Sequence, residues 1–562
     1  MKFKKVFSTA LTVALAGSLL AACSGNNGNN NASPSPSGSS SPDASSSAPA
    51  NTTPQEFRFT LASEPPSLDP AIMTDAQSSI VASGLYDGLT RLNPEGVPEP
   101  AIAKDWQYSE DGKTITFNLR DDAKWTNGDP VTAHDFEYSW KRALDPETAS
   151  EYAYMLYYIE GGEAYNSGEG SADDVGVTAT GDYTLEVKMV SNTPYFHNLT
   201  AHYTYWPVNK NAADGKPEWA AEANTIVSNG PFVLSEWAHG DKLVLTKNPD
   251  YYRADEISFT TVTISLVEDD STVFNLFETD KIDWIGAQAG SVPSDRVPQL
   301  VAEGKATIHT IASTYYYLLN TKQAPFDNVK VRKALSMSID RQAIIDNVTK
   351  ANQTPAYGLV PPSIAGVDGK NFREIYPDNY FTENVEEAKK LLAEGLEESG
   401  FSSFPDTTLT YNTNEGHKAI AEAVIDMWRK NLGIEVKLTN QEWGTFLEAR
   451  KAGQFNIARS GWGADINHAI NFSYDLIHPK SGNNDGKYDN PAVGKALDDA
   501  ILAADDKTRL ELIAQAEKTA IADDMAVIPI YYYTTVTMEK DGFEDVVSDY
   551  AGHLDWAFGK KK

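Results

Sequence analysis

Apolar and polar residues alternate over several short segments of this chain, which is the pattern of half-buried β-strands. In residues 113–120 the apolar positions are Ile115, Phe117 and Leu119, and an Asp111-Gly112 turn precedes them. The same alternation recurs in residues 183–189, around Leu243 and Leu245, and in residues 262–267. These segments predict strands that each cover one side of a core.

The C-terminal half has the pattern of a strand, a helix and a second strand. Residues 409–411 predict a strand, and apolar residues then recur at helical spacing in residues 420–432 before Gly433, a residue type that commonly ends helices. Residues 434–438 alternate again, which completes a βαβ unit with two parallel strands. Residues 443–452 predict a further helix and residues 455–460 a further strand. The alternation of helices and strands predicts an α/β protein.

Gly461-Trp462-Gly463-Ala464-Asp465 follows the last of these predicted strands. In open α/β sheets, ligands bind beyond the carboxyl ends of the strands. This segment is therefore the first place where the pattern predicts a binding site.

The N-terminus has the pattern of a secretory signal. Lys2, Lys4 and Lys5 precede an apolar stretch in residues 6–20 that is too short for a comfortable membrane span. The following Leu-Ala-Ala-Cys resembles a bacterial lipobox, in which the cysteine is lipidated. Cys23 is the only cysteine of the 562 residues, so a disulfide within the chain is impossible. We expect residues 1–22 to be a lipoprotein signal peptide and Cys23 to carry the lipid; the alternative is an inert, packed thiol.

Residues 23–54 combine the expected lipid anchor with a linker made almost only of Ser, Asn, Gly, Pro, Ala and Thr. This composition cannot bury enough apolar surface to offset its ordering entropy, which predicts a disordered tether. A protein anchored in this way is held at the extracellular face of the cell membrane. The length of the tether favours a Gram-positive surface.

Size and charge narrow the function further. The remaining 500 or so residues exceed what one core supports, so two or more lobes are expected. The formal net charge is -32, and no Lys/Arg-rich run supplies the basic face of a nucleic-acid binder. Beyond the signal, no apolar stretch has membrane-spanning length. We expect no contact with nucleic acid and a membrane contact only through the lipid.

Motifs of catalysis and metal binding are missing from the sequence. There is no Gly-x-Ser-x-Gly elbow, phosphate-binding loop, His-Glu-x-x-His helix or Cys/His cluster. His197 and His202 lie five residues apart, which does not fit a zinc-binding helix face, and packing histidines are commoner. We therefore expect no enzyme, no cofactor and no metal. The chain has 27 Tyr and 11 Trp, clustered in residues 152–158, 203–206, 315–317 and 531–533, which predicts either core or the walls of a pocket.

From residue 57 onward the sequence resembles the oligopeptide-binding proteins of the peptide/nickel family of ABC-transporter receptors. The stretches that carry the resemblance stand in the expected order: Pro66-Ser-Leu-Asp-Pro70, Leu85-Tyr-Asp-Gly-Leu89, Lys124-Trp-Thr-Asn-Gly-Asp-Pro-Val131, Phe136-Glu-Tyr-Ser-Trp-Lys-Arg142, Ser228-Asn-Gly-Pro-Phe232, Arg459-Ser-Gly-Trp-Gly-Ala-Asp465 and Val527-Ile-Pro-Ile-Tyr-Tyr-Tyr533. The resemblance implies a two-lobed periplasmic-binding-protein-like α/β fold with an extra domain in the first lobe. The expected borders are 55–313 for lobe 1, with an insertion at about 80–200, 314–530 for lobe 2, and 531–562 for a return to lobe 1.

The resemblance also implies the site. Asp465 matches the aspartate that pairs with the α-ammonium of a peptide, although it could instead be a loop or capping residue. Gly461, Trp462 and Gly463 match a main-chain contact with the ligand. Further matches are aromatic residues that line the cleft and arginines that bind the peptide carboxylate or form ion pairs within the lobe: Tyr138, Trp443, Arg450 and Arg459.

The function implied is a monomeric, extracellular solute-binding lipoprotein that captures short peptides and delivers them to an ABC permease. Two alternatives stay open: the same fold binding a dipeptide, nickel chelate, haem or oligosaccharide, or a receptor for peptide signals. Residues 467–471 lack the Glu-Pro pair usual in the family, which leaves the size of the pocket open.

Overall fold

The structure is a computed structural model that describes residues 55–562. The expected signal peptide, the lipidation site Cys23 and the linker up to residue 54 lie outside the described residues. No helix between residues 55 and 562 is long and apolar enough to cross a membrane.

The first sheet has four strands in the order β1-β10-β9-β8. Their bounds are Glu56–Leu61 for β1, Thr261–Leu266 for β10, Lys242–Lys247 for β9 and Phe232–Ala238 for β8. β1 runs parallel to β10, and the other two contacts are antiparallel. The strands expected around Leu243 and Leu245 and in residues 262–267 are thus confirmed. Both leucines are fully buried, as their alternation with polar residues requires.

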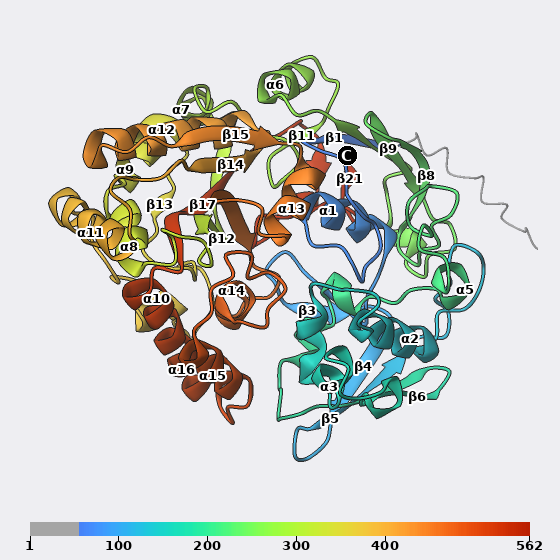
Figure 1. Ribbon diagram of the computed structural model, residues 1–562. Coiled ribbons are helices and arrows are strands. Elements are labelled where there is room, and N and C mark those ends of the chain that lie inside the picture. Colours follow the sequence, from blue (N-terminus) through green and yellow to red (C-terminus); the bar gives the residue numbers. More distant parts are fainter. Residues whose placement is uncertain (1–54) are drawn as a thin grey trace, which may run out of the picture. The chain divides into compact units, whose positions relative to one another are not determined.

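A second, antiparallel sheet is inserted between β1 and β8 in the sequence, with the order β4-β5-β7-β6 (Figure 1). The bounds are Ala103–Tyr108, Thr114–Leu119, Thr184–Lys188 and Val177–Gly181 in that order. The two strands expected in residues 113–120 and 183–189 pair with each other and place Phe117 opposite Leu185. Helix α2 (Ala133–Leu144) buries Trp140 beneath this sheet, and a hairpin of β2 (Thr90–Leu92) and β3 (Pro98–Pro100) lies beside it.

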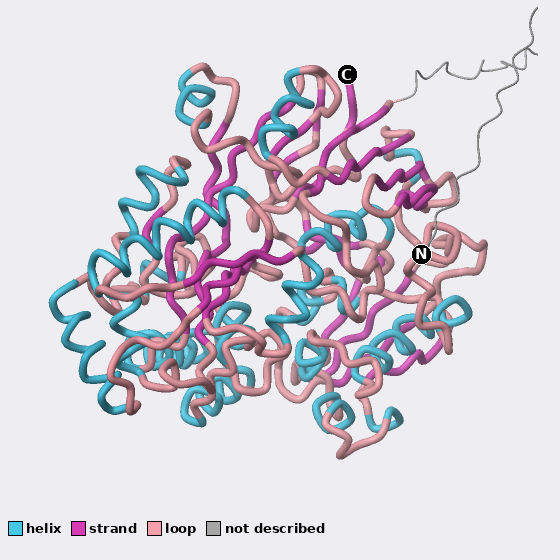
Figure 2. The backbone as a smooth tube through the Cα atoms, turned by 45° about the horizontal axis from the view of Figure 1, so that its top comes forward, coloured by secondary structure: helices cyan, strands magenta, loops and turns pink. Residues whose placement is uncertain are grey.

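The largest sheet has the order β11-β17-β12-β16-β14-β15, with β13 beside β17. Its strands are β11 (Trp284–Ile285), β17 (Val527–Glu539), β12 (Thr307–Leu319), β16 (Ile457–Gly463), β14 (Thr408–Asn412), β15 (Lys437–Gln441) and β13 (Thr354–Pro355). Figures 1 and 2 show helices α8 (Val329–Met337), α11 (Val385–Glu398) and α12 (Glu415–Leu432) on the outer side of this sheet.

The expected βαβ unit is confirmed as β14, α12 and β15, with parallel strands and with Gly433 in the left-handed conformation that ends α12. Several boundaries differ from the prediction. Ile434 and Val436 are buried before the second strand begins, because pairing with β14 starts only at Lys437. The strand expected to end at residue 460 continues as β16 through Gly463, because β12 pairs with it up to that residue. Gly461, Trp462 and Gly463 therefore belong to the strand and do not follow it.

These sheets form a two-lobed α/β fold with an extra domain in the first lobe. β12 and β17 are 13 residues long each and lie side by side, with irregular pairing between Thr310 and Thr314. The lobe borders expected at residues 313/314 and 530/531 fall inside these two strands and stay predictions. Near the C-terminus, Trp556 packs against Phe59 and Phe232 of the first sheet and donates a hydrogen bond to Ile80 O.

Small strand pairs complete the C-terminal region: β18 (Phe543–Glu544) with β21 (Lys560–Lys561), and β19 (Val547–Ser548) with β20 (Leu554–Asp555). The other helices are α1 (Ala76–Leu85), α3 (Gly162–Asn166), α4 (Phe196–Leu199), α5 (Lys210–Ala213), α6 (Asp270–Glu278), α7 (Val297–Ala302), α9 (Arg341–Ile344), α10 (Phe372–Ile375), α13 (Trp443–Lys451), α14 (Ile470–Ile477), α15 (Pro491–Ile501) and α16 (Asp506–Lys518).

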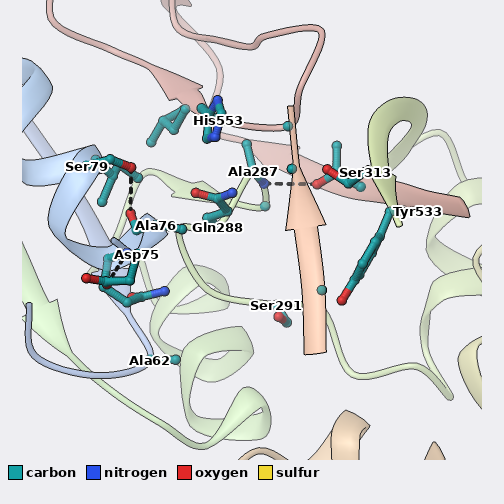
Figure 3. A pocket seen from close by; sticks show the side chains of 18 of the residues that line it. Ala62, Asp75, Ala76, Ser79, Ala287, Gln288, Ser291, Ser313, Tyr533 and His553 are labelled. Carbon is teal, nitrogen blue, oxygen red and sulfur yellow. Dashed lines mark hydrogen bonds between the residues drawn. The ribbon is translucent and has the colours of Figure 1, made fainter. Parts of the chain in front are cut away.

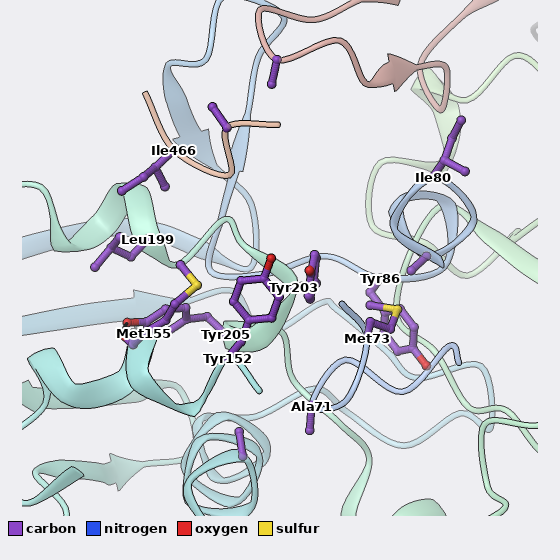
Figure 4. Close-up of a cluster of buried hydrophobic side chains, with 14 of the residues drawn as sticks. Ala71, Met73, Ile80, Tyr86, Tyr152, Met155, Leu199, Tyr203, Tyr205 and Ile466 are labelled. Carbon is purple, nitrogen blue, oxygen red and sulfur yellow. Dashed lines mark hydrogen bonds between the residues drawn. The ribbon is translucent and has the colours of Figure 1, made fainter. Parts of the chain in front are cut away.

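One buried cluster crosses from the first lobe to the second. Tyr152, Tyr203 and Leu199 of the inserted domain belong to the same cluster as Ile466 and Ala469, which follow β16. Figure 4 shows Ile466 near Leu199, with Met155, Tyr203 and Tyr205 around them. The lobes are therefore in direct contact in this structure. Part of the tyrosine content predicted to form core or pocket walls lies along this contact.

Candidate functional site

A cavity of about 1230 Å³ lies between the two lobes. The first lobe lines it with the start of α1, residues 201–203, residues 286–295 and residues 552–555. The second lobe lines it with residues 412–417, part of α13, and β16 from Arg459 onward. Figure 3 shows side chains around this space from α1, from residues 287–291 and from His553 near the C-terminus. Drug-sized pockets measure roughly 300–1,000 Å³, so this cavity suits a ligand larger than a single amino acid.

Asp465 stands at one end of the cavity, two residues after β16, with its side chain 12% exposed. Its Oδ2 accepts hydrogen bonds from Asn471 Nδ2 (3.0 Å) and from the Tyr152 hydroxyl of the other lobe (3.4 Å). Its Oδ1 lies 3.4 Å from His202 Nε2, also of the other lobe. Burial alone would raise the pKa of Asp465, but His202, Asn471 and His553 together hold it below its usual value. The carboxylate is therefore ionised and faces the cavity.

Asn471 holds this carboxylate in place from behind. Its Oδ1 accepts from the backbone N–H of Asp465 (2.7 Å), while its Nδ2 donates to Asp465 and to a second carboxylate, Asp475. Asp475 is only 4% exposed. Burial and the charge of Asp465 raise the pKa of Asp475 well above its usual value. The pKa values of the two carboxyls are thus shifted in opposite directions, and Asp465 at the cavity is the more readily ionised of the pair.

β16 presents part of one edge to the cavity. β12 pairs with β16 along its whole length, whereas β14 pairs with it only at Ile457 and Ala458. Among the described residues, no strand pairs with the other edge of β16 from Arg459 to Gly463. Gly461, Trp462 and Gly463 all line the cavity there. Glycine suits position 461, since a Cβ there would come within 3.1 Å of the Tyr533 hydroxyl.

Trp443 reaches across the cavity from the start of α13. Its Nε1–H donates a hydrogen bond to Asp75 Oδ1 at 3.3 Å, and Asp75 caps the N-terminus of α1 in the first lobe. The ring stacks on Phe446 with 6.3 Å between centroids. Trp443 thus forms both an aromatic wall and a link between the lobes.

Arg459 lies on the cavity floor without a carboxylate partner. It donates to the Tyr533 hydroxyl (2.7 Å) and to Asn412 Oδ1 (3.4 Å), and its guanidinium lies 5.0 Å from the ring centre of Tyr315. Within residues 55–562 its Nε has no hydrogen-bond partner. His417 is nearby and is neutral, because burial and the charge of Arg459 lower its pKa well below the usual value. A cation with no countercharge suits an anionic group of a ligand.

Arg450 also lines the cavity, but its charge is already matched. Its Nε donates to Asp485 Oδ2 at 2.6 Å, and its Nη1 donates to Ser460 Oγ at 3.2 Å. Asp485 is 7% exposed in its side chain. This is the ion pair within the lobe that the sequence left open as the alternative role.

Tyr138 is the candidate that the structure does not bring to the others. It lies on α2 of the inserted domain, with the Lys210 ammonium 5.4 Å from its ring centre, and it is not among the residues that line the cavity. The reason is that α2 turns this face toward α5 and away from the second lobe.

Several residues that contact Asp465 or Arg459 were not named as site residues from the sequence: Tyr152, His202 and Asn471 at Asp465, and Asn412 and Tyr533 at Arg459. Tyr152 and Tyr203 belonged to predicted aromatic clusters, which was a usable signal. His202 was noted only as an unlikely metal ligand. No local sequence pattern marks His202 or Asn471 as a site residue. The contact of His202 with Asp465 depends on the approach of a distant segment. Among the described residues, no group of three or more His, Cys, Asp or Glu is placed to bind a metal.

Comparison with known proteins is consistent across sequence and structure. Residues 97–484 match the family described as bacterial extracellular solute-binding proteins, family 5 Middle. The oligopeptide-binding protein OppA of Bacillus subtilis is 40% identical over 499 residues, covering 88% of this chain and 90% of that protein.

Two solved structures extend the likeness to the fold. The substrate-binding domain of an oligopeptide ABC transporter from Bacillus anthracis has a TM-score of 0.86 at 30% identity and covers 91% of this chain and 99% of its own. OppA of Haemophilus influenzae, solved with the peptide RPPGFSPFR, has a TM-score of 0.83 at 33% identity and covers 90% of this chain and 99% of its own.

Proposed function

The chain belongs to the bacterial extracellular solute-binding proteins of family 5, and we propose that it captures short peptides and delivers them to an ABC importer. Its relatives at this level of identity are receptors, and one of them was solved with a nine-residue peptide. The fold is that of a periplasmic-binding-protein-like receptor, a non-enzymatic kind of protein.

The unpaired edge of β16 from Arg459 to Gly463 is the observation that carries this proposal. An extended peptide can add to such an edge as one more strand, so that its main chain supplies affinity whatever its sequence. Its side chains would then point alternately to either side, into a cavity large enough to hold them together with water. Recognition of this kind accepts many sequences.

Asp465 is proposed to bind the peptide α-ammonium. The carboxylate is ionised, faces the cavity and sits just beyond the free strand edge. A charge-assisted hydrogen bond in this partly desolvated place is stronger than one in water. Asn471 fixes the side chain, so little conformational freedom is lost when the ligand arrives.

Arg459 is proposed to attract the other end of the peptide, because its guanidinium has no carboxylate partner. Trp443 is proposed to line the side-chain space and to hold the closed lobes together through Asp75. Arg450 is proposed to support the cavity wall through its pair with Asp485. Peptide capture then stabilises the closed arrangement, a population shift limited by the ligand's differential affinity for the two states.

The setting of the protein in the cell is also part of the proposal. We infer from the sequence that residues 1–22 are removed, that Cys23 carries the lipid, and that residues 24–54 act as a tether. The receptor is then a monomer held on the extracellular face of a Gram-positive membrane, within reach of its permease. Mass spectrometry of the N-terminal peptide from the native membrane tests this, since a diacylated Cys23 is expected and an unmodified thiol contradicts it.

A thermal-shift titration tests the ligand class. The soluble protein from residue 24 onward is unfolded, washed free of bound ligand and refolded. It is then mixed with di- to hexapeptides, their N-acetylated forms, nickel-histidine and cello-oligosaccharides. A ligand present at 100 times its Kd stabilises by about 2.7 kcal/mol, or roughly 2–3 °C for a protein of this size. Free peptides should raise Tm and the other solutes should not. Stabilisation by sugars or metal chelates alone would overturn the peptide assignment and leave the fold standing.

A further inference from the structure

Tyrosines of the inserted domain pack against residues 462–526, the segment that runs from the end of β16 to the start of β17 and contains α14, α15 and α16. Three stacked ring pairs cross this contact, with centroids 6.2, 5.7 and 5.5 Å apart: Tyr152 with Trp462, Tyr154 with Tyr474, and Tyr195 with His468. We call these three pairs and the groups around them the tyrosine interface. Tyr152 and Trp462 also line the cavity, whereas the other four rings lie outside its lining.

Tyr195 has the most elaborate surroundings of the three tyrosines. Its ring plane lies at 16° to that of His468, and the guanidinium carbon of Arg509 lies 5.0 Å from the ring centre. Arg509 is 1% exposed in its side chain and donates hydrogen bonds to Ala500 O (3.2 Å) and Ala503 O (2.8 Å). A cation–π contact is strongest when the cation is desolvated, as it is here. Tyr195 is therefore expected to supply a large share of the energy of the tyrosine interface.

Charged and main-chain groups surround the rings. Lys480 Nζ lies 2.5 Å from Glu163 Oε1, and Lys451 Nζ of α13 lies 2.6 Å from Glu151 Oε1. The main chains also approach each other closely, because a Cβ built on Gly482 would collide with the carbonyl oxygen of Glu151. An apolar centre with a charged rim is the usual composition of an interface between separately folded parts.

Each side of the tyrosine interface is fixed to its own lobe. Arg142 of the inserted domain donates through both Nη atoms to Asp69, at 2.9 and 2.6 Å, and Asp69 is 3% exposed. On the other side, Arg332 of α8 donates to Asp524 O at 2.9 Å. The inserted domain lies between β1 and β8 in the sequence and the facing segment between β16 and β17, so no short connection joins the two sides. They can separate without losing the packing that holds each of them to its lobe.

We propose that the tyrosine interface is a latch that forms as the lobes close over a peptide and slows the release of every peptide alike. The cavity lies between the lobes, and ligands enter and leave such cavities by hinged opening. Tyr152 and Trp462 belong to both the cavity lining and the interface, which makes the two continuous. This inference rests on the proposed peptide-receptor function and adds to it positioning residues that touch no ligand.

The latch acts through the closing equilibrium. Contacts that exist only in the closed state favour that state, and they raise the apparent affinity of any ligand that requires it. Since Tyr195 and its partners lie outside the cavity lining, their loss should change the affinity of different peptides by one common factor. That factor should appear in the dissociation rate, where most differences among variants of one interface are found.

Tyr195→Leu removes the ring and keeps an apolar side chain. In the soluble protein from residue 24 onward, it should raise the dissociation rates of tri-alanine and tri-lysine by the same factor, roughly tenfold, because a stacked pair and a cation–π contact are lost. Stopped-flow tryptophan fluorescence measures these rates, with Trp443 and Trp462 in the cavity wall as probes. Calorimetry on the same samples measures the Kd values.

Two matched variants separate loss of the latch from a general disturbance of the fold. Tyr195→Phe keeps the ring and should stay within about twofold of the parent dissociation rates. Tyr183→Leu makes the same substitution elsewhere in the inserted domain, at a partly buried tyrosine just before β7. It should leave both dissociation rates unchanged.

A charge reversal at the rim tests the same claim without disturbing the buried rings, since Lys480 and Glu163 are 58% and 51% exposed. Lys480→Glu places two carboxylates together and should raise both dissociation rates about twofold at low salt, because exposed ion pairs are weak. Adding Glu163→Lys to the same protein should restore the parent rates. Salt at about 0.5 M should remove the difference between the three proteins.

The outcomes separate the latch from the receptor function. A common increase in both rates in Tyr195→Leu, absent from Tyr195→Phe and Tyr183→Leu, supports the latch. Unchanged rates in Tyr195→Leu overturn it while the receptor function stands, and an increase for one peptide alone overturns it by assigning Tyr195 to ligand recognition. If Tyr195→Leu does not fold, the charge reversal and its restoration decide. A parent protein that binds no peptide removes the proposed function, and this inference with it.

Discussion

At the Asp465 end of the cleft, a carboxylate is surrounded by donors from both lobes, whereas at the Arg459 end a guanidinium meets only phenols and an amide that lie on its own sheet. Asp465 contacts Asn471 from its own lobe and Tyr152 and His202 from the other. Arg459 contacts Tyr533 of β17 and Asn412 of β14, and both strands belong to the same sheet as β16.

On the proposed roles, the two ends of the cleft recognise a peptide by different means. The groups around Asp465 come from both lobes, so the proposed binding of an ammonium there would exchange hydrogen-bond partners and be coupled to closure. Arg459 has its hydrogen-bond partners on its own sheet, and among the described residues no carboxylate pairs with its charge.

Apart from substitution of Asp465 itself, the largest loss of peptide affinity is expected on substitution of Arg459. Arg459→Met removes the cation but keeps a long, flexible side chain. It should weaken peptides with a free carboxylate by about 2 kcal/mol, or roughly 30-fold in Kd, because a charge-assisted hydrogen bond is lost. Calorimetry with tri-alanine and its C-terminal amide measures this. An equal loss for both ligands would remove Arg459 from carboxylate recognition.

Arg450→Met sharpens the contrast, since Arg450 is the arginine of the cavity whose charge is matched. Removing it leaves the nearly buried Asp485 without its partner, which should cost about 2 kcal/mol of folding stability and lower Tm by roughly 2 °C. The affinity for tri-alanine should change less than that of Arg459→Met. Differential scanning calorimetry measures the change in Tm, and peptide titration on the same sample measures the change in affinity. A Tm equal to the parent value together with a large loss of affinity would reverse the roles of the two arginines.

A smaller loss of affinity is expected on substitution of Trp443, which links the two lobes through its hydrogen bond to Asp75. Trp443→Phe keeps an aromatic ring and removes the Nε1–H that binds Asp75. The loss of one hydrogen bond to a buried carboxylate should weaken closure by about 1 kcal/mol and reduce affinity roughly fivefold for all peptides alike. Small-angle scattering of the empty protein should show a larger radius of gyration. A loss confined to peptides with one kind of side chain would assign Trp443 to specificity instead.

The smallest effect concerns the second carboxylate behind Asp465. Because the folded-state pKa of Asp475 is raised, its contribution to stability is present below the unfolded pKa of about 3.9 and is lost as pH rises toward the folded pKa. Asp475→Asn mimics the protonated form and should raise Tm by about 1 °C or more at pH 7. At pH 4 the two proteins should melt together. A variant that is less stable at pH 7 would show that Asp475 is ionised in the fold.

Much of the fold was predictable because it depends on local patterns. Alternation located β5, β7, β9 and β10, and the helical spacing of residues 420–432 located α12 and its end at Gly433. The end of β16 was wrong by three residues, because Gly461 and Gly463 are poor strand formers alone and are kept in the strand by pairing with β12.

The candidate site was predictable only in part. The motif around Asp465 located a carboxylate that lines the cavity and the strand edge beside it, while the role of Asp465 as an anchor stays a prediction. Its environment could not be predicted, since Tyr152 and His202 reach Asp465 from segments about 260–310 residues away in the sequence. The role of Arg450 was undecided for the same reason, as Asp485 lies outside its motif. Tyr138 was expected to line the cleft because its motif matches the family. The structure places it on a helix face turned away from the cavity, so the motif alone did not predict its position.

The central claim is that Asp465 binds the peptide α-ammonium, and one double comparison tests it most directly. The Kd values of tri-alanine and N-acetyl-tri-alanine are measured by calorimetry for the parent protein and for Asp465→Asn. Losing one partner of a buried charge pair costs about 2–5 kcal/mol, so the variant should weaken the free peptide by roughly 30-fold or more. The acetylated peptide should change little. Equal weakening of both peptides would contradict the account and leave Asp465 a structural residue of the closed cleft.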